Sequence, residues 1–448
     1  MLAGVAIWPL GGARPVFWAG VGALLCLILL IDTLSGRRPA RLEAPSLKIA
    51  AVIVYGLITY GVLQAAPIAP AGLAHPAFET FALARDEPPP TFAPISANPT
   101  ASLQAALLGT VVALFALAGR LAGRQRGSAY LALDIVLGSI TLAALTSIIL
   151  APFGNPFPWL AERWTYQDRP AGPFVNPNMF GYLCASGVVI AAALGTRLAG
   201  ERLGSGAGLR ADLIDGVTAL AGRAGVYLVS LLICAHAMLA TGSRNAIFAL
   251  AAAALASLVW GALASRGRGT LPLLGGALAL TLIVLFSPAN GLLAERVMWA
   301  AVDERHEIYQ DIVTAIRANP LLGHGLGAFA DAFPVYQTAF RPGGARVLYA
   351  HSFWLGLAFD LGLAALALAI SALLLWLFHF GRQALRRNSV RDTLALGLLV
   401  LTAVFGLADD PFQTPGAVFV VAFSLGVCSA SRSGWRAGPP SQAPAPRN

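Results

Sequence analysis

Long, continuous apolar runs separated by short polar segments dominate this chain. A helix needs about 20 residues to cross roughly 30 Å of hydrocarbon, and the runs approach that length. Their continuity excludes the alternating pattern of a transmembrane β-barrel. The predicted spans are residues 16–34, 47–66, 101–119, 128–151, 178–196, 224–241, 246–265, 270–288, 351–380, 393–410 and 414–430. Residues 1–10 are apolar but too short to cross, which is typical of a half-inserted segment or of the end of an earlier helix.

Composition supports the same interpretation. Only 11% of the 448 residues are charged, whereas soluble proteins carry roughly 25%. The four cysteines all lie in apolar runs and form no metal-binding or disulfide pattern. We therefore predict an all-α integral membrane protein with about 11–12 transmembrane helices and a large, partly helical external loop.

The distribution of charge predicts the orientation. The net charge of +9 could suggest nucleic-acid binding, but 20 of the 30 basic residues lie in one set of alternate loops. Positive charge marks cytoplasmic loops, so these loops and the C-terminus are predicted to be cytoplasmic, and no nucleic-acid partner is expected. The external loops are longer and chemically richer, so a functional site is expected on the external face.

Four regions follow from this pattern. They are an N-terminal transmembrane bundle (1–288), a large periplasmic loop (289–350), C-terminal transmembrane helices (351–431) and a cytoplasmic tail (432–448). The tail is rich in Pro, Ala and Arg and is predicted to be disordered.

The large loop contains two recognisable segments. Apolar positions within 299–317, including Tyr309, have the spacing of an amphipathic helix that Asn319-Pro320 would end. A glycine-rich turn around His324 follows. Such a turn alone is a weak indication of phosphate binding, because tight turns are common, and His324 fits a structural role as readily as a substrate contact.

Arginines on the external face are more informative. Arg244 lies in a short hairpin between two spans, Arg296 and Arg305 flank the start of the amphipathic helix, and Arg169 precedes the 178–196 span. Ionisable residues at the membrane edge are costly and are therefore functional candidates, and arginine suits bidentate phosphate recognition. Headgroup anchoring is the alternative, and we favour it for Arg341 and Arg346.

Histidine and amide side chains supply the remaining candidates. His351 lies at the external mouth of the 351–380 span, where it could act as a general base or simply bind a backbone carbonyl. Asn176 and Asn178 directly precede a span. They could line a polar pocket or cap a helix.

Four segments together resemble the O-antigen ligase family in order and spacing. They are Gly172–Tyr182, Thr241–Asn245, Asp303–Phe329 and Ala350–Gly362. The resemblance implies about twelve transmembrane helices in a GT-C-like fold and transfer of a glycan from undecaprenyl pyrophosphate to an acceptor hydroxyl. It implies no nucleotide sugar and, for the ligases, no metal or other cofactor. Where the family often has His-Asn, this chain has His351-Ser352, which weakens a role for an amide there.

The resemblance also implies residue roles and a location. Arg244 and Arg305 would match arginines linked to the donor pyrophosphate, and His351 would match the histidine at the start of the helix after the loop. Our own hypothesis for the mechanism is direct displacement with inversion at the sugar carbon, with His351 as the base and Arg296 as a supporting contact. Arg169, Asn176, Asn178, Tyr309 and His324 complete the predicted substrate-binding set. The site would face the periplasm in a bacterial inner membrane, with lipid A-core or another glycan as acceptor. An O-antigen or exopolysaccharide polymerase, a protein-glycosylating enzyme and a polytopic transporter remain alternatives.

Overall fold

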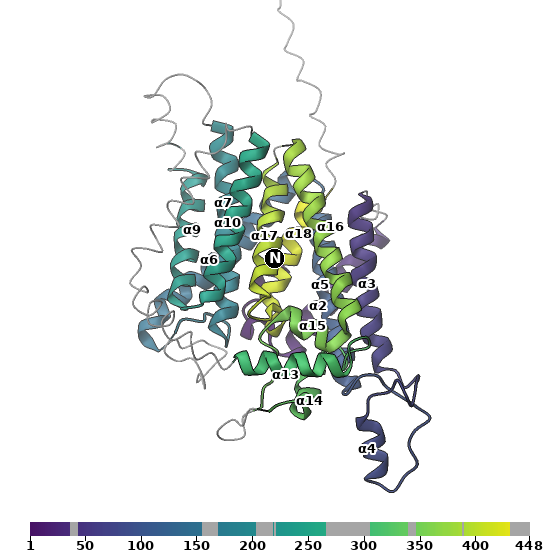
Figure 1. Cartoon of the computed structure of the whole chain (residues 1–448). Coiled ribbons are helices and arrows are strands. Elements are labelled where there is room, and N and C mark those ends of the chain that lie inside the picture. Colours follow the sequence, from purple (N-terminus) through teal and green to yellow (C-terminus); the bar gives the residue numbers. More distant parts are fainter. Residues whose placement is uncertain are drawn as a thin grey trace, which may run out of the picture.

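The computed structural model describes residues 1–35, 44–154, 169–202, 218, 221–265, 305–338, 346–387 and 389–430. Regular structure in this part of the chain is almost entirely helical, which confirms the predicted all-α class (Figure 1). The longer helices are α2 (Pro15–Leu34), α3 (Pro45–Ala65), α5 (Pro99–Ala122), α6 (Arg126–Leu150), α7 (Pro177–Arg202), α9 (Arg223–Ala240), α10 (Arg244–Ser265), α13 (Arg305–Ala318), α16 (Leu363–Arg387), α17 (Val390–Phe405) and α18 (Pro415–Ser429).

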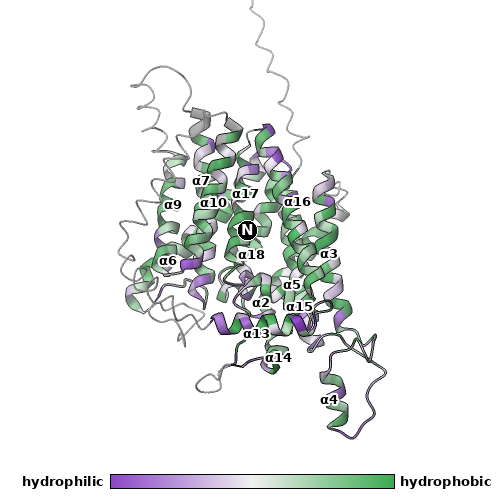
Figure 2. Cartoon of the chain, in the orientation of Figure 1, coloured by the Kyte–Doolittle hydropathy of each residue, from purple (hydrophilic) through white to green (hydrophobic). Residues whose placement is uncertain are grey.

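Eight helices of the described residues are long and apolar enough to cross a membrane: α2, α3, α5, α6, α7, α9, α10 and α16. Figure 2 shows hydrophobic residues along their length. Helices α17 and α18 are shorter and mostly buried inside the bundle. Except for the 351–380 span, the bounds agree with the predicted spans to within a few residues, and the predicted span 270–288 lies outside the described residues.

Helix α7 forms the centre of the bundle. In an 18-residue window, 78% of α7 is buried, compared with 17–39% for the other seven candidate spans. It packs against α9, α17 and α10. The outer helices expose large aliphatic side chains such as Leu27, Ile28 and Leu255. Exposed aliphatic residues on long apolar helices are what a lipid-facing surface requires.

Small residues bring α5 and α18 into close contact. A Cβ atom on Gly119 would overlap the Phe423 backbone, and one on Gly426 would overlap the Ala116 backbone. Gly119 and Gly123 have the four-residue spacing that allows two membrane helices to approach closely. This contact places the C-terminal helix beside the N-terminal half of the chain.

The predicted continuous span 351–380 is wrong. The chain instead forms α15 (Phe353–Leu361), breaks at Gly362 and resumes as α16. Gly362 has φ 86° and directly faces the Leu321 carbonyl, so a side chain there would collide with it. The Leu363 N–H donates to the Pro320 carbonyl over 2.8 Å. The break therefore leaves room for the backbone of Pro320 and Leu321 at the junction of α15 and α16.

Helix α13 lies across one end of the bundle, beside α14 (Phe329–Ala332) (Figure 1). Its apolar side packs against the aromatic residues of α14, of η4 (Phe333–Val335) and of α15. The predicted amphipathic helix is thus confirmed over its described part. The connection between α3 and α5 contains α4 (Ala77–Leu83) and a short pairing of β1 (Ala69–Pro70) with β2 (Phe92–Ala93).

The remaining short elements lie at helix ends. The N-terminal segment forms α1 (Leu2–Val5) and η1 (Leu10–Gly12), which pack against α6 and α18. Short 3-10 turns η2 (Ala151–Phe153) and η6 (Pro411–Gln413) follow α6 and precede α18.

Candidate active site

A short connection between α17 and α18, residues 405–410, is the meeting point of four other elements. We call it the 405–410 segment. The Asn245 side-chain amide, in the first turn of α10, donates to the Phe405 carbonyl over 2.7 Å. The Arg305 guanidinium, at the first residue of α13, donates from Nη1 to the Ala408 carbonyl over 2.8 Å. Arg244, the first residue of α10, is half-buried beside Asn245.

The same segment also binds the starts of α15 and α7. The Phe353 N–H donates to the carbonyls of Gly406 and Asp409, over 2.9 and 3.1 Å. The Asn178 amide donates from Nδ2 to Asp409 Oδ2 over 2.8 Å. The segment thus joins α7, α10, α13 and α15, which carry Asn178, Arg244 and Arg305 and adjoin His351.

Asp409 is a residue that the sequence interpretation missed. Its side chain is only 1% exposed, and besides Asn178 it accepts from the Asp410 N–H over 3.1 Å. Burial raises the pKa of Asp409, while the attraction of Arg305 and the Asn178 hydrogen bond oppose that rise. Two adjacent carboxylates at the end of an apolar run were a usable signal, because such charges are costly there.

The neighbouring carboxylate, Asp410, begins the turn into α18. Its Oδ1 accepts from the Phe412 N–H over 2.9 Å. Burial raises the pKa of Asp410 to about 6, the Phe412 N–H opposes that rise, and the charge of Asp409 adds to it. The pair is therefore more readily protonated than carboxylates in water.

His351 has an unusual backbone. Its φ of 51° lies in the left-handed region, which residues with a Cβ atom rarely adopt. The Tyr309 hydroxyl donates to the His351 carbonyl over 2.8 Å and so ties α13 to this turn. Ser352 caps α15, accepting from the Leu355 N–H over 3.4 Å. Strained residues held by surrounding contacts are typical of functional sites, and Ser352 has the capping role that an amide could also fill.

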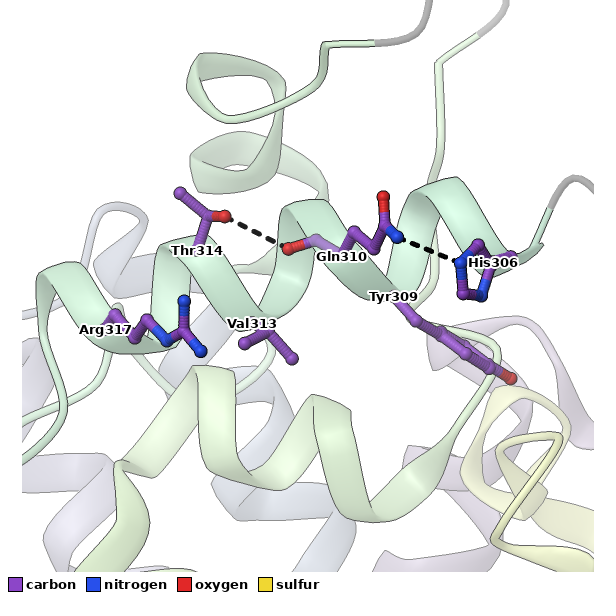
Figure 3. A pocket seen from close by; sticks show the side chains of 6 residues that line it. All are labelled: His306, Tyr309, Gln310, Val313, Thr314 and Arg317. Atoms are coloured by element: carbon purple, nitrogen blue, oxygen red, sulfur yellow. Dashed lines mark hydrogen bonds between the residues drawn. The ribbon is translucent and has the colours of Figure 1, made fainter.

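An open cavity of about 340 Å³ runs along one side of α13, next to Tyr309. Figure 3 shows its lining of His306, Tyr309, Gln310, Val313, Thr314 and Arg317. Gln310 Nε2 lies 2.9 Å from His306 Nε2, and the Thr314 hydroxyl donates to the Gln310 carbonyl over 3.1 Å. An aromatic ring beside amide, hydroxyl and guanidinium groups can contact both the apolar faces and the hydroxyls of a sugar.

The backbone N–H groups of the glycine-rich turn donate hydrogen bonds to other parts of the protein. The backbone N–H groups of His324 and Gly325 donate to the carbonyls of Phe359 and Asp360, over 2.9 and 3.0 Å. The Gly327 N–H donates to Asp360 Oδ2 over 2.7 Å, and the Leu326 N–H donates to Gln64 Oε1 over 3.0 Å. With these donors engaged, the turn fastens the loop to α3 and α15 instead of presenting a cradle for phosphate.

His324 takes part in attaching this turn to the rest of the protein. It is 2% exposed, its Nε2 lies 3.1 Å from the Ala315 carbonyl, and its ring packs against Phe359 and Tyr336. Burial lowers the pKa of His324. These contacts describe a structural histidine, so we leave His324 out of the proposed site.

The other predicted residues have mixed outcomes. Asn176 accepts from the Asn178 N–H over 2.9 Å and so helps to begin α7, while Asn178 also reaches Asp409. Arg169 is half-buried before α7, and its substrate role stays a prediction. Arg296 lies outside the described residues.

Comparison with known protein families assigns part of the chain to a family. Residues 229–370 match the family model described as O-antigen ligase. This part of the chain is an O-antigen ligase family domain. The matched region includes Arg244, Arg305 and His351, whereas Asn178 and Asp409 lie outside it. Among curated proteins, no match to the chain was found.

Family and fold together define the broad class. The match supports a membrane glycosyltransferase of the O-antigen ligase and polymerase family, which implies a lipid-linked glycan donor and a glycan acceptor. With eight helices able to cross a membrane among the described residues, the protein is a multi-pass bacterial membrane protein.

Proposed function

We propose that the site around the 405–410 segment transfers a glycan from undecaprenyl pyrophosphate to a hydroxyl of the lipid A-core, at the periplasmic face of the inner membrane. The observation that carries this proposal is the double attachment of α13. Arg305 binds the Ala408 carbonyl and Tyr309, four residues later, binds the His351 carbonyl. One helix therefore links an arginine suited to pyrophosphate with the candidate base.

The donor's chemistry fits the position of these groups. A lipid pyrophosphate is anchored in the membrane, so its phosphates lie at the headgroup level, at the end of the bundle that α13 crosses (Figure 1). Arg244 and Arg305 each begin a helix at that end. Arginines fixed there stabilise the negative charge that develops on a pyrophosphate leaving group.

Transfer then needs one base. The acceptor oxygen forms a bond to the anomeric carbon as the bond from that carbon to the pyrophosphate oxygen breaks, and the hydroxyl proton moves to the imidazole of His351. Attack from the face opposite the leaving group inverts the anomeric carbon. Asp409 holds Asn178 and attracts Arg305, so we assign it a positioning role.

The α13 cavity is the proposed path of a glycan chain. Its lining runs from His306 to Arg317 and includes Tyr309, whose hydroxyl donates to the His351 carbonyl. A sugar chain lying in this cavity would have one end near His351, the proposed base. In this proposal Arg169 and Arg296 are further donor contacts.

The acceptor distinguishes the ligase from its alternatives. A polymerase of the same family would add repeat units to a second lipid-linked glycan, and the site described here suits either acceptor. We favour the ligase, and we place a transporter last because the candidate polar groups gather at one end of the bundle and not at its middle.

The test uses cells that lack this gene and examines their lipopolysaccharide on a gel. Wild type should restore capped lipopolysaccharide, whereas Arg244→Ala and His351→Ala at matched protein levels should not. Arg346→Ala is the matched control, because this exposed loop arginine is not assigned to the site and should complement fully. Core carrying single repeat units in the knockout would indicate a polymerase, and full complementation by both site variants would refute the proposal.

A further inference from the structure

A second cavity, far from the 405–410 segment, lies among the ends of α6, α7 and α9. Its volume is about 310 Å³, and we call it the arginine pocket. Its lining residues are Arg126, Gly127, Tyr130, Leu131, Asp134, Arg197 and Arg223. Three helices each contribute one arginine to it.

The contacts at the other helix ends place this pocket on the opposite face of the membrane. Asn178, in the first turn of α7, binds Asp409, and the pocket residue Arg197 lies about five turns further along α7. Helix α5 starts beside Asn98, which binds Asp331 of α14, and it ends just before Arg126. The pocket therefore lies on the face that the charge distribution predicts to be cytoplasmic.

Two of the three arginines are held in defined positions. The Arg197 guanidinium carbon lies 3.4 Å from the centroid of the Tyr130 ring. This cation–π contact holds the guanidinium over the ring. Arg223 Nη2 lies 3.6 Å from Asp134 Oδ2, and the Tyr227 hydroxyl donates to Asp134 Oδ1 over 2.7 Å.

The described lining contains more arginines than carboxylates. It combines three arginines with a single carboxylate, and that carboxylate is already bound by Tyr227 and Arg223. Arg126 and Gly127 lie in the first turn of α6, where the helix dipole adds to the positive potential. An anion with several oxygen acceptors is the class of ligand that suits this pocket.

Other arginines on this face are used differently. Arg120 donates to the Ser429 carbonyl, and Arg391 donates to the Val427 and Cys428 carbonyls, so both cap the end of α18. The arginine pocket instead surrounds a cavity. Leu131, which is 56% exposed, borders the same cavity and provides an apolar surface beside the charges.

We propose that the arginine pocket binds the phosphate of an anionic phospholipid from the cytoplasmic leaflet, with the guanidinium groups of Arg126 and Arg197 on the phosphate and Leu131 beside the lipid's apolar part. Basic pockets between membrane helices on the cytoplasmic side suit such headgroups. A soluble phosphate has the same charged group but has no apolar part that could contact Leu131. The proposal is independent of glycan transfer.

The test measures lipid retention by the purified full-length protein with native mass spectrometry, titrating phosphatidylglycerol or phosphatidylcholine into detergent micelles. Wild type should retain phosphatidylglycerol in preference to phosphatidylcholine. Arg126→Gln/Arg197→Gln should weaken that binding about tenfold or more. The matched control is Arg386→Gln/Arg387→Gln, which removes the same charge from exposed positions at the end of α16 and should change binding less than about twofold.

Three outcomes would overturn the proposal. The pocket variant could retain phosphatidylglycerol as well as wild type, or both double variants could weaken binding equally, which would indicate surface charge alone. Inorganic phosphate could displace the lipid at concentrations comparable to the lipid's, which would assign the pocket to a soluble ligand. Should the double variant misfold, Arg126→Gln, at an exposed first residue of α6, must by itself weaken binding at least about threefold.

Discussion

The left-handed backbone of His351 affects stability, whereas its imidazole is proposed to act in transfer. Two substitutions at this residue can distinguish these two effects. His351→Ala and His351→Gly both remove the imidazole, so every interaction of that ring is absent from both variants. The two variants differ only in the Cβ atom at residue 351, where φ is 51°: alanine keeps this atom and glycine does not. The Tyr309 bond to the residue-351 carbonyl is available to both variants.

The difference in stability follows from two opposing terms. A residue with a Cβ atom in the left-handed region costs about 1–2 kcal/mol, which glycine avoids. Glycine also makes the unfolded chain more flexible, which costs about 0.4–1 kcal/mol. We therefore expect His351→Gly to be more stable than His351→Ala by about 0.5–1 kcal/mol. In a chain of this size that is a rise of about 1 °C in the unfolding temperature.

The assay is replicate thermal unfolding of the purified variants in one detergent, with glycan transfer measured in parallel. Neither variant should transfer glycan, because neither has the base. Ala350→Gly is the control, and its sign should be opposite, because among the described non-glycine residues only Leu10, Asp86 and His351 have a positive φ. If His351→Ala proved as stable as His351→Gly, the assigned backbone strain would be wrong.

Three further predictions concern packing, positioning and pH. Gly119→Ala should destabilise the protein by about 1–3 kcal/mol because its Cβ meets the α18 backbone, whereas Gly138→Ala, with open space around it, should be neutral or stabilising in thermal unfolding. Asp409→Leu should cost about 1 kcal/mol by removing the acceptor of the half-buried Asn178 amide and should abolish transfer, and an active variant would refute its positioning role. Asp410, with its pKa raised to about 6, binds its proton more tightly when folded, so its contribution to stability falls as pH rises from about 4 to about 6. Asp410→Asn should therefore reduce the gain in unfolding temperature on going from pH 7 to pH 5, and an unchanged gain would contradict the assignment.

The sequence could predict those features that depend on local pattern. The 101–119 span corresponds to α5 and the 414–430 span to α18, because an apolar run of that length has few alternatives in a membrane. The spacing of apolar residues likewise predicted α13, and Asn319-Pro320 follows its last residue, Ala318.

Features that depend on distant partners could not be predicted. Asp360 and Gly362 interrupt the apolar run from 351 to 380, but a break there could not be predicted with its partners, because its cause is the loop backbone at Pro320 and Leu321. The role of Asp409 depends on Asn178, which is 231 residues away. In the sequence, the glycine-rich turn was a weak indication of phosphate binding. The structure shows that its backbone N–H groups instead donate to Gln64 and Asp360.

The central claim is that the site at the 405–410 segment transfers a glycan from a lipid pyrophosphate. The most direct measurement places the purified protein in liposomes with a synthetic undecaprenyl-pyrophosphate-linked glycan and lipid A-core, and quantifies the joined product. Wild type and Arg346→Ala should form the product with inverted anomeric configuration, and His351→Ala should form none. Transfer by His351→Ala at the wild-type rate, or a covalent glycosyl-enzyme intermediate in wild type, would contradict the account.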